Sequence, residues 1–102
     1  MAKARAFCVL TLKSGVKKKD LRKFLEKEWL PVVRSAPGCL EAELLDTYYD
    51  RAGYCISELW ESKEIHMESS SSLWTETRKD LYSKRDNYAV VEQRWHCTIL
   101  DS

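Results

Sequence analysis

Two strand-like segments in the middle of the chain are joined by a very short connection, which limits the topologies open to it. The segments are Leu40–Tyr48 and Tyr54–Trp60, and between them lies Tyr49-Asp50-Arg51-Ala52-Gly53. Parallel strands need a crossover of a dozen or more residues, whereas a short turn with Asp and Gly suits antiparallel pairing. The centre of the chain is therefore predicted to be an antiparallel hairpin.

A helical pattern precedes this hairpin and a second one follows it. From Lys17 onward apolar residues recur at steps of three and four: Leu21, Phe24, Leu25, Trp29, Val32 and Val33. The Ala36-Pro37-Gly38 sequence ends this pattern. Pro31 falls inside this stretch and predicts a kink or a restart. Downstream, Ser62 is a candidate N-cap for a helix whose face carries Ile65, Leu73, Thr77 and Leu81. The serine run at 69–72 predicts a loose or broken middle of that helix.

Strand-like segments also lie near both ends of the chain. Ala6–Lys13 is β-rich and stops at Ser14-Gly15, and Tyr88–Leu100 is long and β-rich. The element order is therefore β-α-β-β-α-β within one domain spanning residues 1–102. This order predicts an α+β, ferredoxin-like fold with an antiparallel sheet and two helices on one face.

Alternation along the strands predicts an apolar sheet face without helices. We expect two sets of side chains to point away from the helices: Cys8, Leu10 and Leu12 on the first strand, and Tyr54, Ile56, Glu58 and Trp60 on the third. An exposed apolar patch of several hundred Å² is rarely tolerated by a monomer. A second copy packed sheet to sheet would cover it, so we predict a homodimer through this face, with a cavity in each half.

Composition and charge argue against several classes of partner. The formal net charge is +1, which does not favour a nucleic-acid partner. We find no secretory signal and no apolar stretch near the roughly 20 residues of a membrane span, so a cytoplasmic location without a membrane partner is expected. The four cysteines form no CxxC pair and there are two histidines, so we predict reduced thiols and expect no metal and no cofactor.

Three landmarks then resemble a known family. They are Ala36-Pro37-Gly38-Cys39-Leu40 before the second strand, Ser57-Glu58-Leu59-Trp60-Glu61-Ser62 ending the third, and the element order. Together they resemble the antibiotic biosynthesis monooxygenase (ABM) family of dimeric α+β barrels over nearly the whole chain. The resemblance implies homodimers with an apolar pocket between sheet and helices. Members of the family include cofactor-independent oxygenases of aromatic polyketides, haem-degrading monooxygenases and proteins of small-molecule signal turnover.

The haem-degrading members use an asparagine in the first strand, a tryptophan ending the third and a histidine on the second helix. Trp60 matches the tryptophan. The other two positions fall on Cys8 and near Ser69 or Ser70, and His66 lies about one turn too early. The resemblance therefore does not extend to haem degradation by that mechanism.

Two residues are candidate catalytic groups. Glu58 shares a strand face with Trp60, so enclosure would raise its pKa and suit it as a general base for a phenolic or enolisable substrate. The alternative for Glu58 is an ordinary salt bridge. His66 is a candidate proton shuttle because its ordinary pKa lies near neutrality, although its position in the pattern favours a surface or packing histidine. The same alternatives apply to His96.

The candidate substrate-binding residues are aromatic or apolar. Trp60 could provide a planar surface for an aromatic ligand. It is joined by Cys8, Leu10, Ile56 and Trp74, and each of these could instead pack in an ordinary core. The leading hypothesis is an ABM-like monooxygenase acting on a small apolar or aromatic substrate without a tightly bound cofactor. The alternative is a non-catalytic dimeric α+β barrel that binds a small ligand or serves a structural role.

Overall fold

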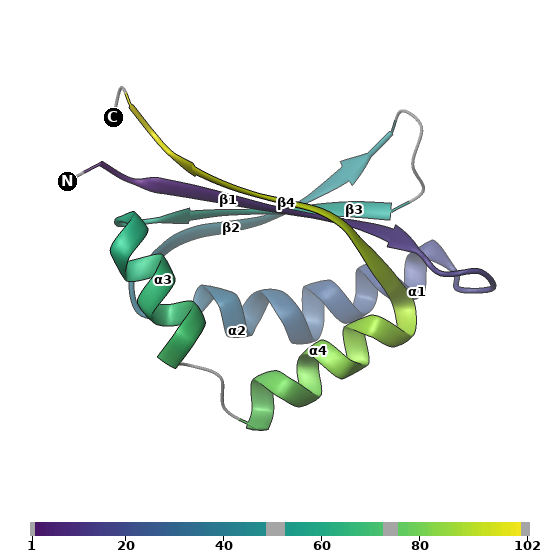
Figure 1. Ribbon diagram of the computed structural model, residues 1–102. Helices are drawn as coiled ribbons and strands as arrows, with labels where there is room; N and C mark the ends of the chain where they lie inside the picture. Colours follow the sequence, from purple (N-terminus) through teal and green to yellow (C-terminus); the bar gives the residue numbers. More distant parts are fainter. Residues whose placement is uncertain (1, 49–52, 73–75, 101–102) are drawn as a thin grey trace.

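A computed structural model of the chain describes residues 2–48, 53–72 and 76–100, and of residues 70–72, 76 and 77 it describes the backbone only. The strands are β1 (Ala4–Leu12), β2 (Cys39–Thr47), β3 (Gly53–Trp60) and β4 (Ala89–Thr98). They form one antiparallel sheet in the order β2-β3-β1-β4. All helical segments lie on the same side of this sheet (Figure 1). The predicted α+β, ferredoxin-like architecture is confirmed.

The first helical stretch runs through three segments: α1 (Lys18–Phe24), the π-helical η1 (Leu25–Trp29) and α2 (Leu30–Arg34). At the start of α2 the Leu30 N–H donates to the carbonyl of Leu25, five residues back. Pro31 follows directly in the first turn of α2. A proline has no N–H, and its ring collides with the carbonyl four residues back in a regular helix. The predicted restart of the helix at Pro31 is thus confirmed, with α2 beginning one residue earlier, at Leu30.

The second helical stretch comprises α3 (Lys63–Ser72) and α4 (Glu76–Tyr88). Ser62 caps α3, because its Oγ accepts a hydrogen bond from the Ile65 N–H at 3.2 Å, as predicted. Helix α3 runs through the serine run and ends at Ser72, and α4 begins at Glu76, so the second helical stretch consists of two helices, as the predicted break in its middle implies. In the part of the chain that is described, no helix combines the length and apolar character needed to cross a membrane.

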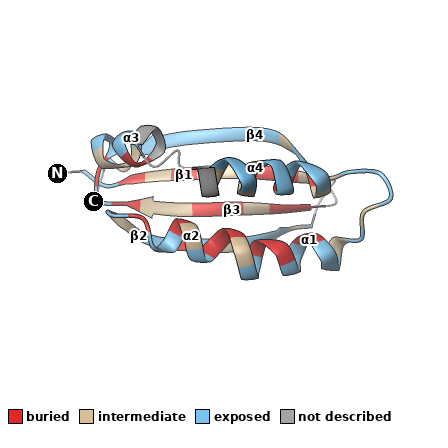
Figure 2. Ribbon diagram, turned by 90° about the horizontal axis from the view of Figure 1, so that it is seen from below, coloured by how far each residue is buried: buried red, intermediate tan, exposed pale blue. Residues whose placement is uncertain are grey.

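The sheet face around Trp60 is the one that the helices cover, which corrects the predicted orientation. Leu10 lies opposite Tyr54 and Ala4 opposite Trp60, so these side chains share a face. That face packs against the apolar stripe of the first helical stretch, which includes Leu21, Phe24, Leu25 and Trp29. Trp60 is 3% exposed. The buried stripe along β3 and the first helical stretch is visible in Figure 2.

The opposite sheet face is bare of helices and also carries large apolar side chains. It includes Phe7 and Leu59, and the exposed Leu45 and Trp95, of which Trp95 is 46% exposed. The Phe7 and Trp95 rings meet edge to face, with centroids 6.4 Å apart. Because both faces of β1 and β3 are apolar, strand alternation does not reveal which face the helices cover. This ambiguity is the reason for the error in orientation.

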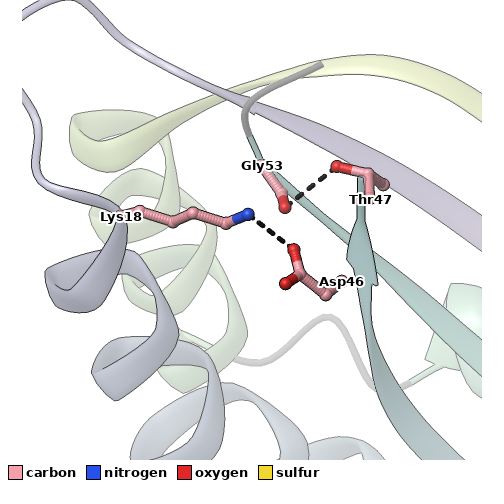
Figure 3. A network of polar contacts seen from close by, with 4 residues as sticks. All are labelled: Lys18, Asp46, Thr47 and Gly53. Atoms are coloured by element: carbon pink, nitrogen blue, oxygen red, sulfur yellow. Dashed lines mark hydrogen bonds and ion pairs between the residues drawn. The ribbon is translucent and has the colours of Figure 1, made fainter. Parts of the chain in front are cut away.

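The start of α1 is tied to the turn end of the β2–β3 hairpin, next to the connection between the two strands. The Lys18 ammonium pairs with the Asp46 carboxylate and lies 5.0 Å from the centroid of the Tyr54 ring. Beside it, the Thr47 hydroxyl donates to the carbonyl of Gly53 at 3.0 Å (Figure 3). The ion pair is largely exposed, so it contributes about 1 kcal/mol or less. Residues 49–52 of the predicted connection lie outside the described residues.

The two sequence landmarks of the family resemblance contact each other at the other end of the sheet. Gly38 has a φ of +85°, in the left-handed region that favours glycine. Its carbonyl accepts a hydrogen bond from the Glu61 N–H at 2.9 Å. A Cβ at position 38 would overlap the Ile65 side chain of α3. The Ala36-Pro37-Gly38 turn therefore has to end in glycine for α3 to pack where it does.

We predict that Gly38→Ala lowers the free energy of unfolding by about 2–4 kcal/mol, from left-handed backbone strain plus the overlap with Ile65. The matched control is Gly15→Ala. Gly15 has a φ of +82° but open space around it, so the strain alone should cost about 1 kcal/mol. Urea unfolding of both variants measures the two losses, and equal losses would contradict the packing role of Gly38.

Candidate functional site

A pocket of about 250 Å³ lies between the sheet and the helices. Its described lining comes from β1, β3 and β4 on the sheet side and from η1, α2, α3 and α4 on the helix side. Small-molecule sites usually measure roughly 300–1,000 Å³, so this pocket suits a ligand of one or two rings. Four of the predicted site residues line it: Cys8, Glu58, Trp60 and His66.

The pocket exists because β1 carries small side chains at one end of its inward face. Ala6 and Cys8 line the pocket, whereas Leu10, two residues further on, is fully buried in the core. Ile56 is likewise in the core, so Leu10 and Ile56, predicted as ligand contacts, pack against the helices instead. Trp74, the remaining predicted contact, lies outside the described residues.

Trp60 and Glu58 form a hydrogen-bonded pair on β3. The Trp60 Nε1–H donates to Glu58 Oε1 at 2.9 Å. Burial raises the pKa of the Glu58 carboxyl above its ordinary value of 4.5, and the Trp60 hydrogen bond and the charges of Arg78 and His96 offset part of that rise. Trp60 is too deeply buried to offer a ligand much surface. Its indole N–H is instead used to hold the Glu58 carboxylate. The carboxylate is held in a fixed position and takes up a proton more readily than an exposed one.

Both histidines of the chain lie beside this pair. The His66 ring centroid is 4.9 Å from that of Trp60 and 5.4 Å from that of His96, with the two imidazoles stacked. Burial lowers the pKa of His66, and the nearby His96 acts in the same direction. His66 is therefore a neutral imidazole at neutral pH and can accept a proton. The structure thus brings together Glu58, Trp60, His66 and His96, which the sequence could only suggest one at a time.

A bulge in β4 brings its polar side chains into the pocket. The pairing of β1 with β4 shifts between Val9 and Leu10, where β4 contributes one extra residue, Glu92. Beyond this bulge Arg94 and His96 face inward and line the pocket. Strict alternation through the bulge would have pointed both away from the helices.

The pocket lining also contains three arginines that the sequence reasoning missed: Arg78, Arg85 and Arg94. Arg78 and Arg85 lie on α4 at a spacing of seven residues, on the same face as Leu81 and Tyr82. Basic residues at positions of an otherwise apolar helical stripe were the signal that could have revealed them. Glu58 is the single carboxylate among the described lining residues, so the pocket is predominantly cationic.

Cys8 is a neutral thiol in this setting. Burial raises its pKa, and a hydrogen bond and charge from Arg94 offset the rise in part. Cys8 and the other three cysteines are free thiols. Across the described part of the chain, no three or more His, Cys, Asp or Glu side chains gather in a way that could hold a metal ion.

Comparisons with known proteins show which solved structures share this fold. No protein-family model matches the sequence, and no curated protein matches it at a significant level. Solved structures do match. SnoaB, a cofactor-independent oxygenase from Streptomyces nogalater, aligns with a TM-score of 0.76 over 100% of this chain and 97% of its own, at 9% identity. A candidate antibiotic biosynthesis monooxygenase from Chloroflexus aurantiacus aligns with a TM-score of 0.71 over 98% and 95%, at 18% identity.

HapK from Hahella chejuensis gives a TM-score of 0.78 over 97% of this chain and 94% of its own, at 10% identity. This chain has the fold of the antibiotic biosynthesis monooxygenases. The resemblance predicted from the Ala-Pro-Gly turn and the segment around Trp60 is confirmed at the level of the fold. In this fold the pocket between sheet and helices brings Glu58, His66 and Arg85 together.

We predict that Glu58→Gln makes the protein more stable than wild type as pH rises. Because folding raises the Glu58 pKa, the stabilising contribution of this carboxyl is fully present below its unfolded pKa. It is lost as pH rises through the folded pKa. A glutamine does not titrate but still accepts the Trp60 hydrogen bond. The advantage of Glu58→Gln should therefore grow between about pH 4 and pH 7, by about 1.4 kcal/mol for each tenfold change in proton affinity.

Urea unfolding at several pH values measures this difference. The matched control is Glu61→Gln, which makes the same change at a neighbouring exposed position. Parallel pH dependence of the two variants would show that Glu58 does not carry a raised pKa.

Proposed function

We propose that this chain is an ABM-like monooxygenase that acts on a small aromatic or enolisable substrate in the pocket, without a tightly bound cofactor. The observation that supports this best is the partly buried Glu58 carboxylate, held by the Trp60 N–H and placed near both histidines. A carboxylate in such a position has the raised pKa that a general base needs near neutral pH. SnoaB, whose fold this chain shares, is itself a cofactor-independent oxygenase.

In the proposed reaction Glu58 or His66 removes a proton from the substrate. The hydrogen bond from Trp60 holds Glu58 Oε1, which leaves Oε2 to accept the proton. The resulting electron-rich carbanion or enolate transfers electrons to O₂ and forms a carbon–oxygen bond. For an enolisable methylene, one oxygen atom becomes the carbonyl oxygen, and the other leaves as water with the two methylene hydrogens. Substrate and O₂ thus supply all the atoms and electrons that this step needs.

The residues of the site divide these tasks between them. Trp60 positions the carboxylate, so we regard it as a positioning residue. His66, neutral at neutral pH, can pass the proton onward, and His96 lies stacked beside it. The apolar side chains of Val32 and Leu81 line the same pocket and would keep water away from the reactive anion.

We predict that Glu58→Gln lowers kcat at least 100-fold, because general-base catalysis contributes about 10²–10⁴-fold. Oxygen uptake by a panel of hydroquinone and enolisable substrates measures turnover. In the wild type the acid limb of the rate against pH should lie above the ordinary range of a glutamate, following the raised pKa. Glu61→Gln, the same change at an exposed neighbour, should leave turnover unaltered.

His66→Ala provides the second arm of this test. Turnover unaffected by both Glu58→Gln and His66→Ala would refute the proposed chemistry. Tight ligand binding without any turnover would instead favour the non-catalytic binding module. Strong haem binding followed by haem breakdown would restore the haem-degrading activity that the residues at Cys8 and Ser69 argue against.

We further propose that the protein is a cytoplasmic homodimer through its sheet face. The face in question is now the outer one, opposite Trp60, and it carries Phe7, Leu45, Leu59 and Trp95. All four of these large apolar side chains remain partly exposed in the single chain. Pairing two such faces would bury them, which is the physical reason for the proposal.

Sedimentation should therefore show a dimer at micromolar concentration for the wild type and a monomer for Trp95→Glu, which would place a charge inside the interface. The control is Met67→Glu, an equally drastic change at an exposed position of α3, which should leave the dimer intact. A wild-type monomer at micromolar concentration would refute the dimer.

A further inference from the structure

Buried polar atoms without a hydrogen-bond partner gather around the pocket. Among the described residues four buried side-chain atoms lack a partner, and three of them belong to pocket-lining residues: Arg85 Nη1, Trp29 Nε1 and Ser69 Oγ. The three residues are 6%, 6% and 5% exposed. A buried donor or acceptor left without a partner destabilises the folded protein. Such a concentration at one cavity indicates that something else supplies the missing acceptors.

Arg85 is held so that one end of its guanidinium remains without a partner. Its Nε and Nη2 donate to Asp86 Oδ1 at 3.2 and 3.1 Å. The guanidinium carbon lies 4.7 Å from the centroid of the Tyr82 ring and 5.2 Å from that of Trp29, so two aromatic rings fix its plane. Trp29 is the last residue of the π-helical segment η1, a geometry often found at functional sites.

The chemistry of these groups selects the kind of partner. Arginine and tryptophan nitrogens can donate hydrogen bonds but cannot accept them. With Arg78 and Arg94 in the same lining, the pocket wall carries three guanidinium groups, against the Glu58 carboxylate in the lining and the Asp86 carboxylate that pairs with Arg85. A carboxylate on the ligand is acceptor-only and negatively charged, so it meets both requirements, and guanidinium binds it in a charge-assisted, bidentate manner.

We infer that the part of the pocket next to α4 is an anion subsite. In it, Arg85, assisted by the Trp29 N–H and the Ser69 hydroxyl, binds a carboxylate of an aromatic ligand. The inference rests on the proposed function in that it names the substrate class of the same pocket: a small aromatic acid. Arg85 and Trp29 are binding residues here, and Glu58 remains the base.

The residues that neighbour successive inward positions of β1 indicate how this ligand would be oriented in the pocket. Glu58 and His96 flank Ala6, while Arg94 pairs with Cys8, two residues along the strand, and the charge of Arg85 acts on the Cys8 thiol. Two residues of a strand span roughly 7 Å. That is about the separation between a ring carboxylate and the far side of a one- or two-ring compound. A carboxylate bound at Arg85 and Arg94 would therefore present the opposite part of the ring to Glu58, which lies nearer to Arg78.

Calorimetric titration with two matched compounds tests the subsite without any turnover. The probes are 2-naphthoate and its neutral amide, 2-naphthamide. The wild type should bind 2-naphthoate about 10- to 100-fold more tightly, as expected for hydrogen bonds to a charged group. In Arg85→Gln this preference should fall to near one, with 2-naphthamide still bound about as tightly as before. The control Arg22→Gln, which removes an exposed arginine paired with Glu26, should keep the full preference.

A second variant guards against a folding defect in Arg85→Gln. Trp29→Phe keeps an aromatic ring but removes the N–H, and it should weaken 2-naphthoate about 2- to 10-fold. The subsite is refuted by an equal affinity of the wild type for both compounds, by no 2-naphthoate binding at millimolar concentration, or by a preference that survives in Arg85→Gln.

These outcomes are distinguishable from those of the proposed reaction. A carboxylate preference together with turnover that is unaffected by both Glu58→Gln and His66→Ala would keep the subsite and reject the chemistry. Turnover that depends on Glu58 or His66, without a carboxylate preference, would keep the chemistry and reject the subsite.

Discussion

The side chains on the inward face of β1 determine where the helices pack closely on the sheet and where a pocket remains. β1 is bonded to β3 on one side and to β4 on the other, so all surrounding side chains take their position from it. Along this face alanine and cysteine at positions 6 and 8 give way to Leu10 and Leu12. At the leucine end the helical stripe around Phe24 closes the core. At the small-residue end the same helices leave space, and that space is the pocket.

Burial gives the groups around this space their chemical character. In water a glutamate would be charged and a histidine half-protonated near neutrality. Here burial works against charge on both Glu58 and His66, raising the pKa of the first and lowering that of the second. Their proton affinities therefore move toward each other, which suits proton exchange between the two. The three arginine guanidinium groups of the same lining add positive charge to the pocket.

The sequence predicted the architecture well because the strand and helix periods are strong signals in this chain. The hairpin, the restart near Pro31 and the Ser62 cap all depend on local chemistry that single residues reveal. The facing of the sheet was not predictable, because residues such as Phe7 and Leu59 make its outer face as apolar as its inner one. The arginines of α4 share a helix face with Leu81 and Tyr82, which was a signal, but a charged side chain on a helix normally points to solvent and they were overlooked for that reason.

The polarity of the pocket depends on the register of β4 beyond its bulge, but it would not change if the extra residue of the bulge were deleted. β4 is an edge strand, bonded to β1 alone. If it slid by one residue beyond the bulge, Trp95 would turn inward and His96 outward, and a polar wall would become an aromatic one. Loss of Glu92, by contrast, would straighten the strand and leave Arg94 on the same side. Evolution could thus remodel this pocket through one-residue insertions and deletions in a single edge strand, without touching the core.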